Sequence, residues 1–380
     1  MDFAWTQEQQ ELSHSLRTIA QAISHDDQRQ AQGDFWTRAQ WRRCAEAGLL
    51  GLCVSQAYGG GGYDALTTAL ALEAFGFGCE DTGLVFSAAA HLLACTMPIV
   101  EAGSDSLKES FLPGLCAGRF VGGNAITEDD AGSDVFALHT RAVREGDEYV
   151  LDGCKSYVSN GPVADVFVVY ARTNPAHGYL GISAFVVERT TPGLILGEPF
   201  TKMGLTSTPA CRVSFEGCRV PASHRLGKEG QGASLFKRSM LWERACLFAL
   251  YLGVMERQLE RTIHYARERR QFGKPIGRNQ AVAHRVADMK LRLEMSRLLL
   301  YRSCWLFGRG EPATLEIALS KLAVSSAAVQ GGLDALHIHG ARGIDCDYGI
   351  ERMLRDAIPG TLFSGTAEMQ RDIIANELGL

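Results

Sequence analysis

Hydrophobic residues recur with two different periods along this chain of 380 residues. Before about Leu115 and after about Gly232 they return every three or four positions, which predicts amphipathic helices. Between these points they form short alternating runs separated by glycine, proline and asparagine, and seven of the eleven prolines fall between Pro113 and Pro221. Short strands without helices between them predict an antiparallel β domain. We therefore expect an α+β protein in which helices flank a central β region.

The pattern predicts three domains: an N-terminal helical domain at residues 1–115, a central β-barrel or β-sandwich domain at 116–228, and a C-terminal helical bundle at 229–380. Thr6 and Gln9 have the spacing of a capping box, which marks the start of the first helix. Further helices are expected at 67–78, 87–103, 233–270, 279–307, 314–338 and 365–378, and strands at 165–172, 182–189 and 211–220. The glycine-rich segment 58–64 lacks the GK[ST] ending of a phosphate loop, so a turn is predicted there.

Charge and cysteine usage narrow the class of protein. The net charge is −5, and apart from the short basic segment 266–270 no cationic block is present, which argues against a nucleic-acid partner. The eleven cysteines are scattered without a CxxC pair, so neither a disulfide framework nor a zinc ribbon is expected. Such cysteine usage suits the reducing cytoplasm, and the N-terminal residues lack the pattern of an export signal.

The segment 239–255 is apolar except for a few positions, and Glu243 and Arg244 are its only charged residues. Its uncharged run is shorter than the roughly 20 residues that cross a membrane, so no membrane partner is expected. No positive residue lies three or four positions from Glu243 on a helix. Burial would raise the pKa of such a carboxylate toward neutrality, as a general base requires. An ion pair or a capped polar position between helices is the structural alternative.

Five short signatures follow one another along the chain: ITEDDAGSD (126–134), KSYVSNG (155–161), FEGCRVP (215–221), RRQFGKPI (269–276) and SGTAEMQR (364–371). In this order they resemble the acyl-CoA dehydrogenase family, and the resemblance covers essentially the whole chain. It implies N-terminal helices, a central β domain and a C-terminal four-helix bundle that together hold FAD. It also implies a homotetramer, or a dimer.

The resemblance implies a set of cofactor-binding residues. The first two signatures would place residues against the flavin: Ala125, Ile126, Thr127, Gly132, Ser133, Tyr157 and Ser159. Others would reach the cofactor from a neighbouring subunit: Arg269, Phe272, Gln280, His337 and Gly340. Thr366 and Glu368 would meet the phosphates and ribose, with Glu368 in place of the more common glutamine. His337 replaces a glutamine; His337 and His339 lack an acidic or cysteine companion at ligand spacing, so no metal site is expected.

One departure from the family concerns the catalytic base. Many members carry it as the glutamate of a Tyr-Glu-Gly-Thr motif, but here that position is Ser364, preceded by Phe363. A branch of the family instead places its glutamate in the bundle helix, before an arginine, and the corresponding residues here are Glu243 and Arg244. Two lines of inference therefore meet on Glu243 as the base. Ser133, Arg244, Phe363 and Ser364 are expected to bind the substrate.

These parts imply α,β-dehydrogenation of an acyl thioester. Four longer blocks, at 83–101, 239–260, 269–285 and 363–370, resemble a subgroup that oxidises L-prolyl thioesters on peptidyl carrier proteins to pyrrole-2-carboxyl thioesters in antibiotic biosynthesis. A short- or branched-chain acyl-CoA dehydrogenase is the first alternative, and a non-catalytic flavoprotein or helical scaffold is the second. The electron acceptor would be an electron-transfer flavoprotein or oxygen.

Overall fold

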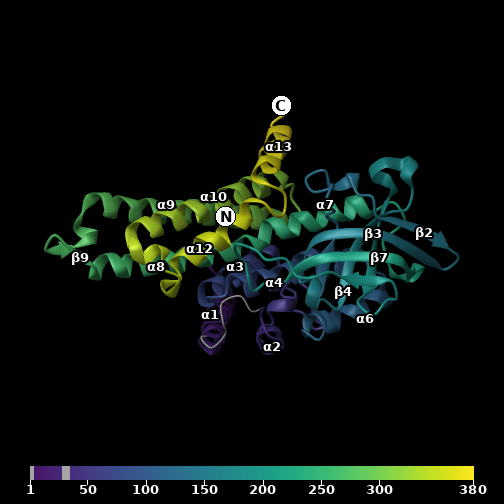
Figure 1. The fold of residues 1–380 in the computed structure, drawn as a ribbon, viewed down its shortest axis with the longest axis horizontal. Helices are drawn as coiled ribbons and strands as arrows, with labels where there is room; N and C mark the ends of the chain where they lie inside the picture. The colour runs from purple at the N-terminus through teal and green to yellow at the C-terminus, as the bar shows by residue number, and fades with distance from the viewer. Residues whose placement is uncertain (1–3, 28–34) are drawn as a thin grey trace.

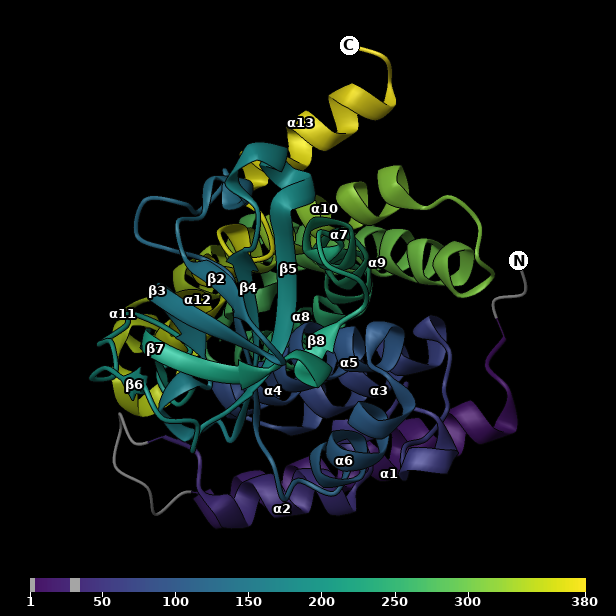
Figure 2. The ribbon, with the colours of Figure 1, turned by 90° about the vertical axis from the view of Figure 1, so that its right-hand side faces the viewer.

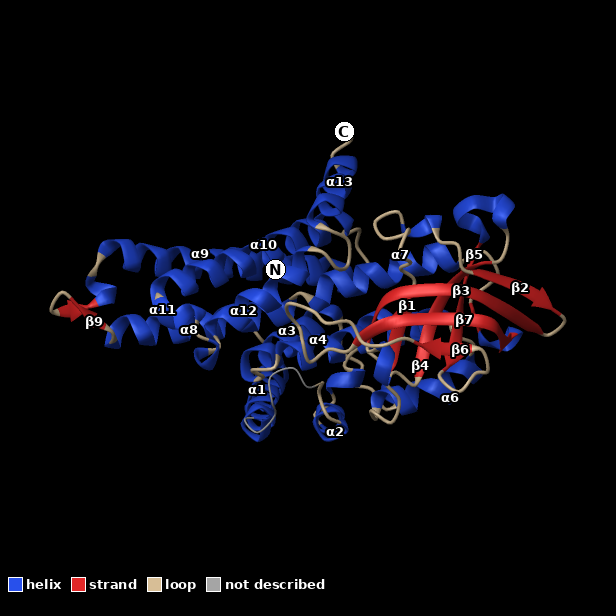
Figure 3. Cartoon of the chain, viewed as in Figure 1, coloured by secondary structure: helices blue, strands red, loops and turns tan. Residues whose placement is uncertain are grey.

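A computed structural model describes residues 4–27 and 35–380 of the chain. The strands of the large sheet lie at one end of an elongated molecule, and long helices extend from them to the other end (Figures 1 and 3). The predicted order of helices, sheet and helices is confirmed. Seen along the long axis, α1 and α2 lie on one side of the body and α13 projects from the opposite side with the C-terminus (Figure 2).

Within the described residues, the α-helices that precede the sheet are α1 (Gln7–Asp27), α2 (Arg38–Glu46), α3 (Ala65–Gly78), α4 (Thr82–Ala90), α5 (Met97–Ala102) and α6 (Asp105–Cys116). The capping box at the start of α1 is present, since the Thr6 N–H donates to Gln9 Oε1 at 3.0 Å and the Gln9 N–H to Thr6 Oγ1 at 3.2 Å. The expected helix at 87–103 is interrupted by η3 (His91–Thr96), a π-helical segment between α4 and α5. The span Thr82–Ala102 is long and apolar enough to cross a membrane, but 89% of its most apolar window is buried inside the protein, as in a core helix.

The central region is one sheet with the strand order β6-β7-β3-β2-β4-β5-β8, and β1 pairs with β4 outside this path. Its strands are β1 (Gly122–Ala125), β2 (Arg141–Glu145), β3 (Glu148–Ser159), β4 (Val166–Arg172), β5 (Ile182–Glu188), β6 (Leu194–Leu196), β7 (Ala210–Pro221) and β8 (Arg225–Leu226). The expectation of a wholly antiparallel domain is corrected in one respect. β1 runs parallel to β4, and β2 meets β4 in parallel at Arg141 and Arg172.

The strands β4 and β5 do not alternate between buried and exposed positions, because both of their faces are covered. On β4, Val166, Val168 and Tyr170 pack into the same core as the helices, whereas Phe167 and Val169 pack into a second core within the β domain. The helices of the two flanking regions therefore rest on one face of this sheet. This packing places the ends of β1 and β3 beside the helical regions.

The C-terminal region contains α7 (Gly232–Trp242), η8 (Glu243–Leu247), α8 (Ala249–Glu268), α9 (Gln280–Gly308), α10 (Thr314–His339), α11 (Ala341–Ile344), α12 (Ile350–Ala357) and α13 (Ala367–Glu377). A hairpin of β9 (Arg270–Gln271) and β10 (Lys274–Pro275) joins α8 to α9 at the end of the bundle that is opposite the β domain (Figure 1). The single helix expected at 233–270 is divided at Glu243, because η8 is a π-helical turn. Such widened turns frequently occur at functional sites.

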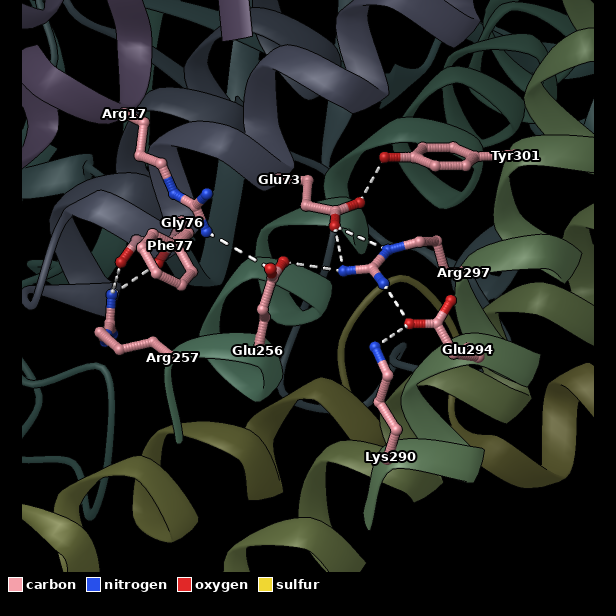
Figure 4. Close-up of polar contacts among 10 residues, drawn as sticks. All are labelled: Arg17, Glu73, Gly76, Phe77, Glu256, Arg257, Lys290, Glu294, Arg297 and Tyr301. Atoms are coloured by element: carbon pink, nitrogen blue, oxygen red, sulfur yellow. Dashed lines mark hydrogen bonds and ion pairs between the residues drawn. The ribbon is translucent and has the colours of Figure 1, made fainter. Parts of the chain in front are cut away.

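A partly buried ionic network joins the N-terminal helices to the bundle (Figure 4). Glu73 of α3 accepts hydrogen bonds from Arg297 Nη2 at 2.6 Å and from the Tyr301 hydroxyl, both on α9. Arg297 also binds Glu256 of α8 at 2.8 Å, and Glu256 contacts Arg17 of α1 at 3.4 Å. Burial raises the pKa of Glu73, although the charge of Arg297 and the hydrogen bonds act in the opposite direction. The network fixes the four helices α1, α3, α8 and α9 relative to one another.

Candidate active site

A cleft opens where the N-terminal helices, the β domain and the bundle meet. Its helical side includes Phe86, Ala90, Ala94, Phe236, Met240, Glu243 and Arg244, and the loop before α13 adds Phe363, Ser364 and Gly365. The β domain contributes Asn124, Ile126, Thr127, Gly132, Ser133, Val135, Ser156, Tyr157 and Ser159. Ten of the residues predicted from the sequence therefore lie in one cleft: Ile126, Thr127, Gly132, Ser133, Tyr157, Ser159, Glu243, Arg244, Phe363 and Ser364.

Glu243 lies at the first position of the π-helical turn, and only 8% of it is exposed. Its Oε1 accepts a hydrogen bond from the Ser364 hydroxyl. Burial raises the pKa of this carboxyl, while the Ser364 hydrogen bond and the charges of Arg244 and Lys321 act in the opposite direction. The pKa of Glu243 is thus raised, as expected from the sequence. The cations that reduce this shift, Arg244 and Lys321, do not lie three or four positions from Glu243 along the chain.

The loop that carries Ser364 has a strained backbone. Ser364 has a φ of 57° and Gly365 a φ of 86°, both in the left-handed region. The Arg244 Nε donates to the Ser364 carbonyl at 2.7 Å, and a Cβ on Gly365 would come within 3.0 Å of Arg244 Nη2. Glycine therefore suits position 365 on two counts. Arg244 holds the loop in the conformation that directs the Ser364 hydroxyl to Glu243.

Phe363 gives the cleft an aromatic wall. Its ring lies 4.8 Å from that of Phe86 and 5.4 Å from that of Phe248, measured between centroids. These contacts join α4, the residue that precedes α8 and the loop before α13. An apolar wall of this kind excludes water from the neighbourhood of Glu243. Burial is therefore the largest influence on the pKa of Glu243, and it raises that pKa.

Lys321 of α10 is a residue that the sequence reasoning missed. It is 0% exposed, and its Nζ has no hydrogen-bond partner among residues 4–27 and 35–380. The ammonium lies 5.3 Å from the centroid of the Phe248 ring, and burial lowers its pKa to about 8. A lysine on the apolar face of a predicted helix is the signal that could have identified it. Its charge acts on Glu243, Arg244 and Glu368.

The β-domain side of the cleft is built on a buried ion pair between Glu128 and Lys155. Lys155 Nζ donates to Glu128 Oε1 at 2.8 Å and to the Ile126 carbonyl at 3.0 Å. Glu128 also accepts from the backbone N–H groups of His139 and Thr140. Burial would raise the pKa of Glu128, but the Lys155 charge and these hydrogen bonds outweigh it and lower the pKa to about 2. Glu128 belongs to the signature at 126–134 and Lys155 to the signature at 155–161, but only the structure shows that their ion pair joins the two segments.

Two polar atoms in the cleft have no partner within the described chain. Asn124 Oδ1 and Ser156 Oγ are buried, line the cleft and make no hydrogen bond. Buried polar groups are rarely left unpaired, so a bound group that offers donors and acceptors would complete them. Beside them stand the hydroxyls of Thr127 and Ser159, and Tyr157 lies exposed on the rim with a φ of 55°. A flavin ring, with its polar edge and flat faces, fits this donor set.

The structure separates the remaining predicted residues from this cleft. Ala125 is fully buried in the β-domain core. Thr366 caps α13 by accepting from the Met369 N–H at 3.3 Å, and Glu368 is exposed and paired with Arg371. Others lie on the distal hairpin and the neighbouring ends of α9 and α10, outside the cleft: Arg269, Phe272, Gln280, His337 and Gly340. Within the described residues, no group of three or more His, Cys, Asp or Glu side chains could hold a metal ion.

Family models match nearly the whole chain: the acyl-CoA dehydrogenase N-terminal domain over residues 6–119, the middle domain over 123–218 and the C-terminal domain over 230–379. The chain belongs to the acyl-CoA dehydrogenase family, and FAD is its cofactor. The resemblance stated from the five signatures is confirmed, and so is the fold that it implied.

Two curated proteins and one solved structure are similar to this chain along most or all of its length. An L-prolyl-[peptidyl-carrier protein] dehydrogenase of Pseudomonas fluorescens is 57% identical over 91% of each chain. Another L-prolyl-[peptidyl-carrier protein] dehydrogenase, from a Serratia species, is 43% identical over 100% of this chain and 99% of its own length. The solved structure of PigA with FAD and proline superposes with a TM-score of 0.98 at 43% identity, and it covers 100% of both chains.

Proposed function

We propose that this protein is an FAD-dependent dehydrogenase that oxidises an L-prolyl thioester on a peptidyl carrier protein to the pyrrole-2-carboxyl thioester. The observation that carries the proposal is the buried Glu243 in the cleft, hydrogen-bonded to Ser364. The likeness to two L-prolyl-[peptidyl-carrier protein] dehydrogenases along almost the entire chain supplies the substrate class. The reaction belongs to the biosynthesis of pyrrole-containing natural products.

Glu243 removes the α-proton of the thioester in this proposal. Its raised pKa gives the carboxylate the proton affinity that a general base needs near neutral pH. Ser364 orients the carboxylate through its hydroxyl, and Arg244 orients Ser364 through its carbonyl. The wall around Phe363 keeps water away from the proton in transfer. FAD supplies the hydride acceptor when it is bound.

The residues that would hold FAD come from the two signatures of the β domain. Thr127, Ser133 and Ser159 offer hydroxyls, and Tyr157 offers an aromatic face. Asn124 and Ser156 add the two unpartnered polar atoms. The Glu128–Lys155 pair holds these segments together, and the Ser156 N–H donates to the Thr127 carbonyl at 2.8 Å. Glu128 and Lys155 are therefore positioning residues for the cofactor site.

The substrate must be a thioester rather than the free amino acid. A thioester carbonyl can spread the negative charge that develops when the α-proton leaves, whereas a carboxylate already carries a negative charge. One desaturation gives a pyrroline, so the pyrrole requires two oxidations and the loss of four hydrogens. An acyl-CoA is the alternative substrate, and an electron-transfer flavoprotein or oxygen accepts the electrons.

The active assembly in this proposal is a homotetramer, or a dimer. Arg269, Phe272, Gln280, His337 and Gly340 lie away from the cleft of their own chain, so they bind FAD only if a neighbouring subunit presents them. An outer face of α9 carries exposed apolar side chains that a neighbour would cover: Leu291, Met295 and Leu298. All eleven cysteines are free, which suits a location in the cytoplasm.

Anaerobic titration of the purified holoenzyme tests the proposal. Prolyl-loaded carrier protein should bleach the flavin absorbance, and mass spectrometry of the carrier after aerobic turnover should show the loss of four hydrogens. Free L-proline should bleach nothing. Rapid bleaching by butyryl-CoA or isovaleryl-CoA, with an unchanged prolyl carrier, would contradict the proposal and favour the acyl-CoA substrate.

A further inference from the structure

A patch of exposed side chains lies on α7 and on η6 (Pro175–Gly181), the segment between β4 and β5. Tyr179 and Leu180 are 57% and 59% exposed, and they are large hydrophobic residues for which a solvated position has no packing benefit. Lys237 and Arg238 of α7 and His177 of η6 are exposed beside them. These five residues, His177, Tyr179, Leu180, Lys237 and Arg238, form the rim patch.

The rim patch is continuous with the cleft. Phe236, which precedes Lys237, lines the cleft, and its ring lies 6.0 Å from that of Phe136. The Lys237 ammonium lies 5.8 Å from the ring centroids of both Phe136 and Tyr179. Lys237 therefore connects the wall of the cleft to the exposed segment η6. Figure 1 shows α7 alongside the β domain, where the two surfaces meet.

The charge of the rim patch is opposite in sign to the charge of the whole chain. Neither α7 nor η6 contains an aspartate or glutamate, although the protein carries a net charge of −5. Glu101 of α5 contacts Arg238 at 3.2 Å, but 63% of the Arg238 side chain remains exposed. The patch thus combines an apolar centre with cations that stay accessible to a partner.

We propose that the rim patch docks the acidic carrier protein that delivers the thioester. This inference rests on the proposed function, because only a carrier-bound substrate leaves a protein outside the cleft. The substrate enters on a flexible prosthetic arm while the carrier remains at the rim. There Tyr179 and Leu180 meet its apolar residues, and Lys237 and Arg238 meet its carboxylates. Complementary charge of this kind raises the rate of encounter and makes it sensitive to salt.

The test compares three prolyl thioesters: the loaded carrier protein, prolyl-pantetheine and prolyl-CoA. The double variant Lys237→Glu/Arg238→Glu is measured by flavin reduction in the holoenzyme. For the loaded carrier, kcat/KM should fall by about tenfold or more and lose its dependence on salt. For prolyl-pantetheine, kcat/KM should stay within about twofold of wild type, because no charged partner meets the rim. The matched control is Arg42→Glu/Arg144→Glu, which changes the net charge equally on α2 and β2.

The outcomes separate the docking surface from the proposed function. An unchanged kcat/KM for the loaded carrier, or an equal fall in the control, overturns the docking surface. If kcat/KM for prolyl-pantetheine falls as much as kcat/KM for the loaded carrier, Lys237 and Arg238 act on the substrate inside the cleft. If kcat/KM for prolyl-CoA falls as much, the two residues bind a nucleotide phosphate. Either result overturns the proposal that they dock the carrier protein. If wild-type enzyme oxidises none of the three thioesters, the proposed function itself fails.

Discussion

Replacing Lys155 with methionine tests whether the buried pair supports the cofactor site. The change deletes two hydrogen bonds from a charged donor, to Glu128 Oε1 and to the Ile126 carbonyl. Each such bond contributes about 1.5 to 3 kcal/mol. Removing one partner of a buried ion pair lowers the free energy of unfolding by roughly 3 to 5 kcal/mol. Because Glu128 keeps its donors from His139 and Thr140, the loss of free energy of unfolding should lie near the lower end of this range.

Thermal unfolding with excess FAD, followed by flavin fluorescence, measures the effect. Lys228→Met is the matched control, since Lys228 is exposed, and its stability should change by no more than about 0.5 kcal/mol. The double variant Glu128→Gln/Lys155→Met should be more stable than Lys155→Met alone, because it also removes the buried negative charge that has lost its cation. A Lys155→Met enzyme that is as stable as the control and retains FAD equally well would refute the positioning role.

The same pair has a pH signature. The pKa of Glu128 is lowered in the folded protein, from an ordinary 4.5 to about 2. A carboxyl with a lowered folded pKa adds stability above its unfolded pKa, and this stability is lost as the pH falls through the folded value. Acidification below about 4.5 should therefore destabilise wild type more steeply than Glu128→Gln, when melting temperatures are compared at each pH.

Three further predictions concern the cleft and the assembly. Glu243→Gln should bind substrate but slow flavin reduction by about 10²- to 10⁴-fold in stopped-flow measurements, whereas Ser364→Ala should cost much less; the reverse order would exclude Glu243 as the base. Lys321→Met and Ser364→Ala each remove a group that lowers the pKa of Glu243. Less carboxylate is then present at a given pH, so the acidic limb of the pH–rate profile should move to higher pH. Lys321→Arg should keep the wild-type profile, and an unmoved acidic limb in Lys321→Met would contradict the role of the Lys321 charge. Arg269→Ala should loosen FAD, measured by cofactor content after gel filtration, while Arg42→Ala should not; equal FAD content in both variants would remove Arg269 from the site.

Local pattern was sufficient to predict most elements of the fold. The strands at β4, β5 and β7 and the helices α3, α9 and α10 lie close to their predicted ranges, because each has a clear period of apolar residues. The parallel pairing of β1 with β4 was not predicted, since it joins segments about 40 residues apart and leaves no local trace. The short helix α12 was also missed. Its eight residues are too few for a periodic pattern to be recognised.

The candidate site was predicted only in part, for the same reason. Glu243 could be found because its apolar helix is visible in the sequence, and burial alone sets the direction of its pKa. The hydroxyl that contacts it comes from Ser364, 121 residues away on the loop before α13, and Lys321 approaches from α10. Neither contact follows from spacing along the chain. The same holds for Lys155 and Glu128, which are 27 residues apart and meet only when β3 packs beside the segment after β1.

Phe272 shows how a residue without a role in its own chain can still be informative. It is 96% exposed at the tip of the β9–β10 hairpin and has a φ of 51°, a conformation that is costly for a bulky side chain. The hairpin is nevertheless ordered by its strand pairing and by the Arg270 Nη2 bond to the Gly273 carbonyl at 2.9 Å. A strained and solvated phenylalanine gains nothing within the monomer. Burial against a neighbouring subunit would offset both costs, so in the proposed assembly a change to this hairpin should weaken subunit association and FAD binding together.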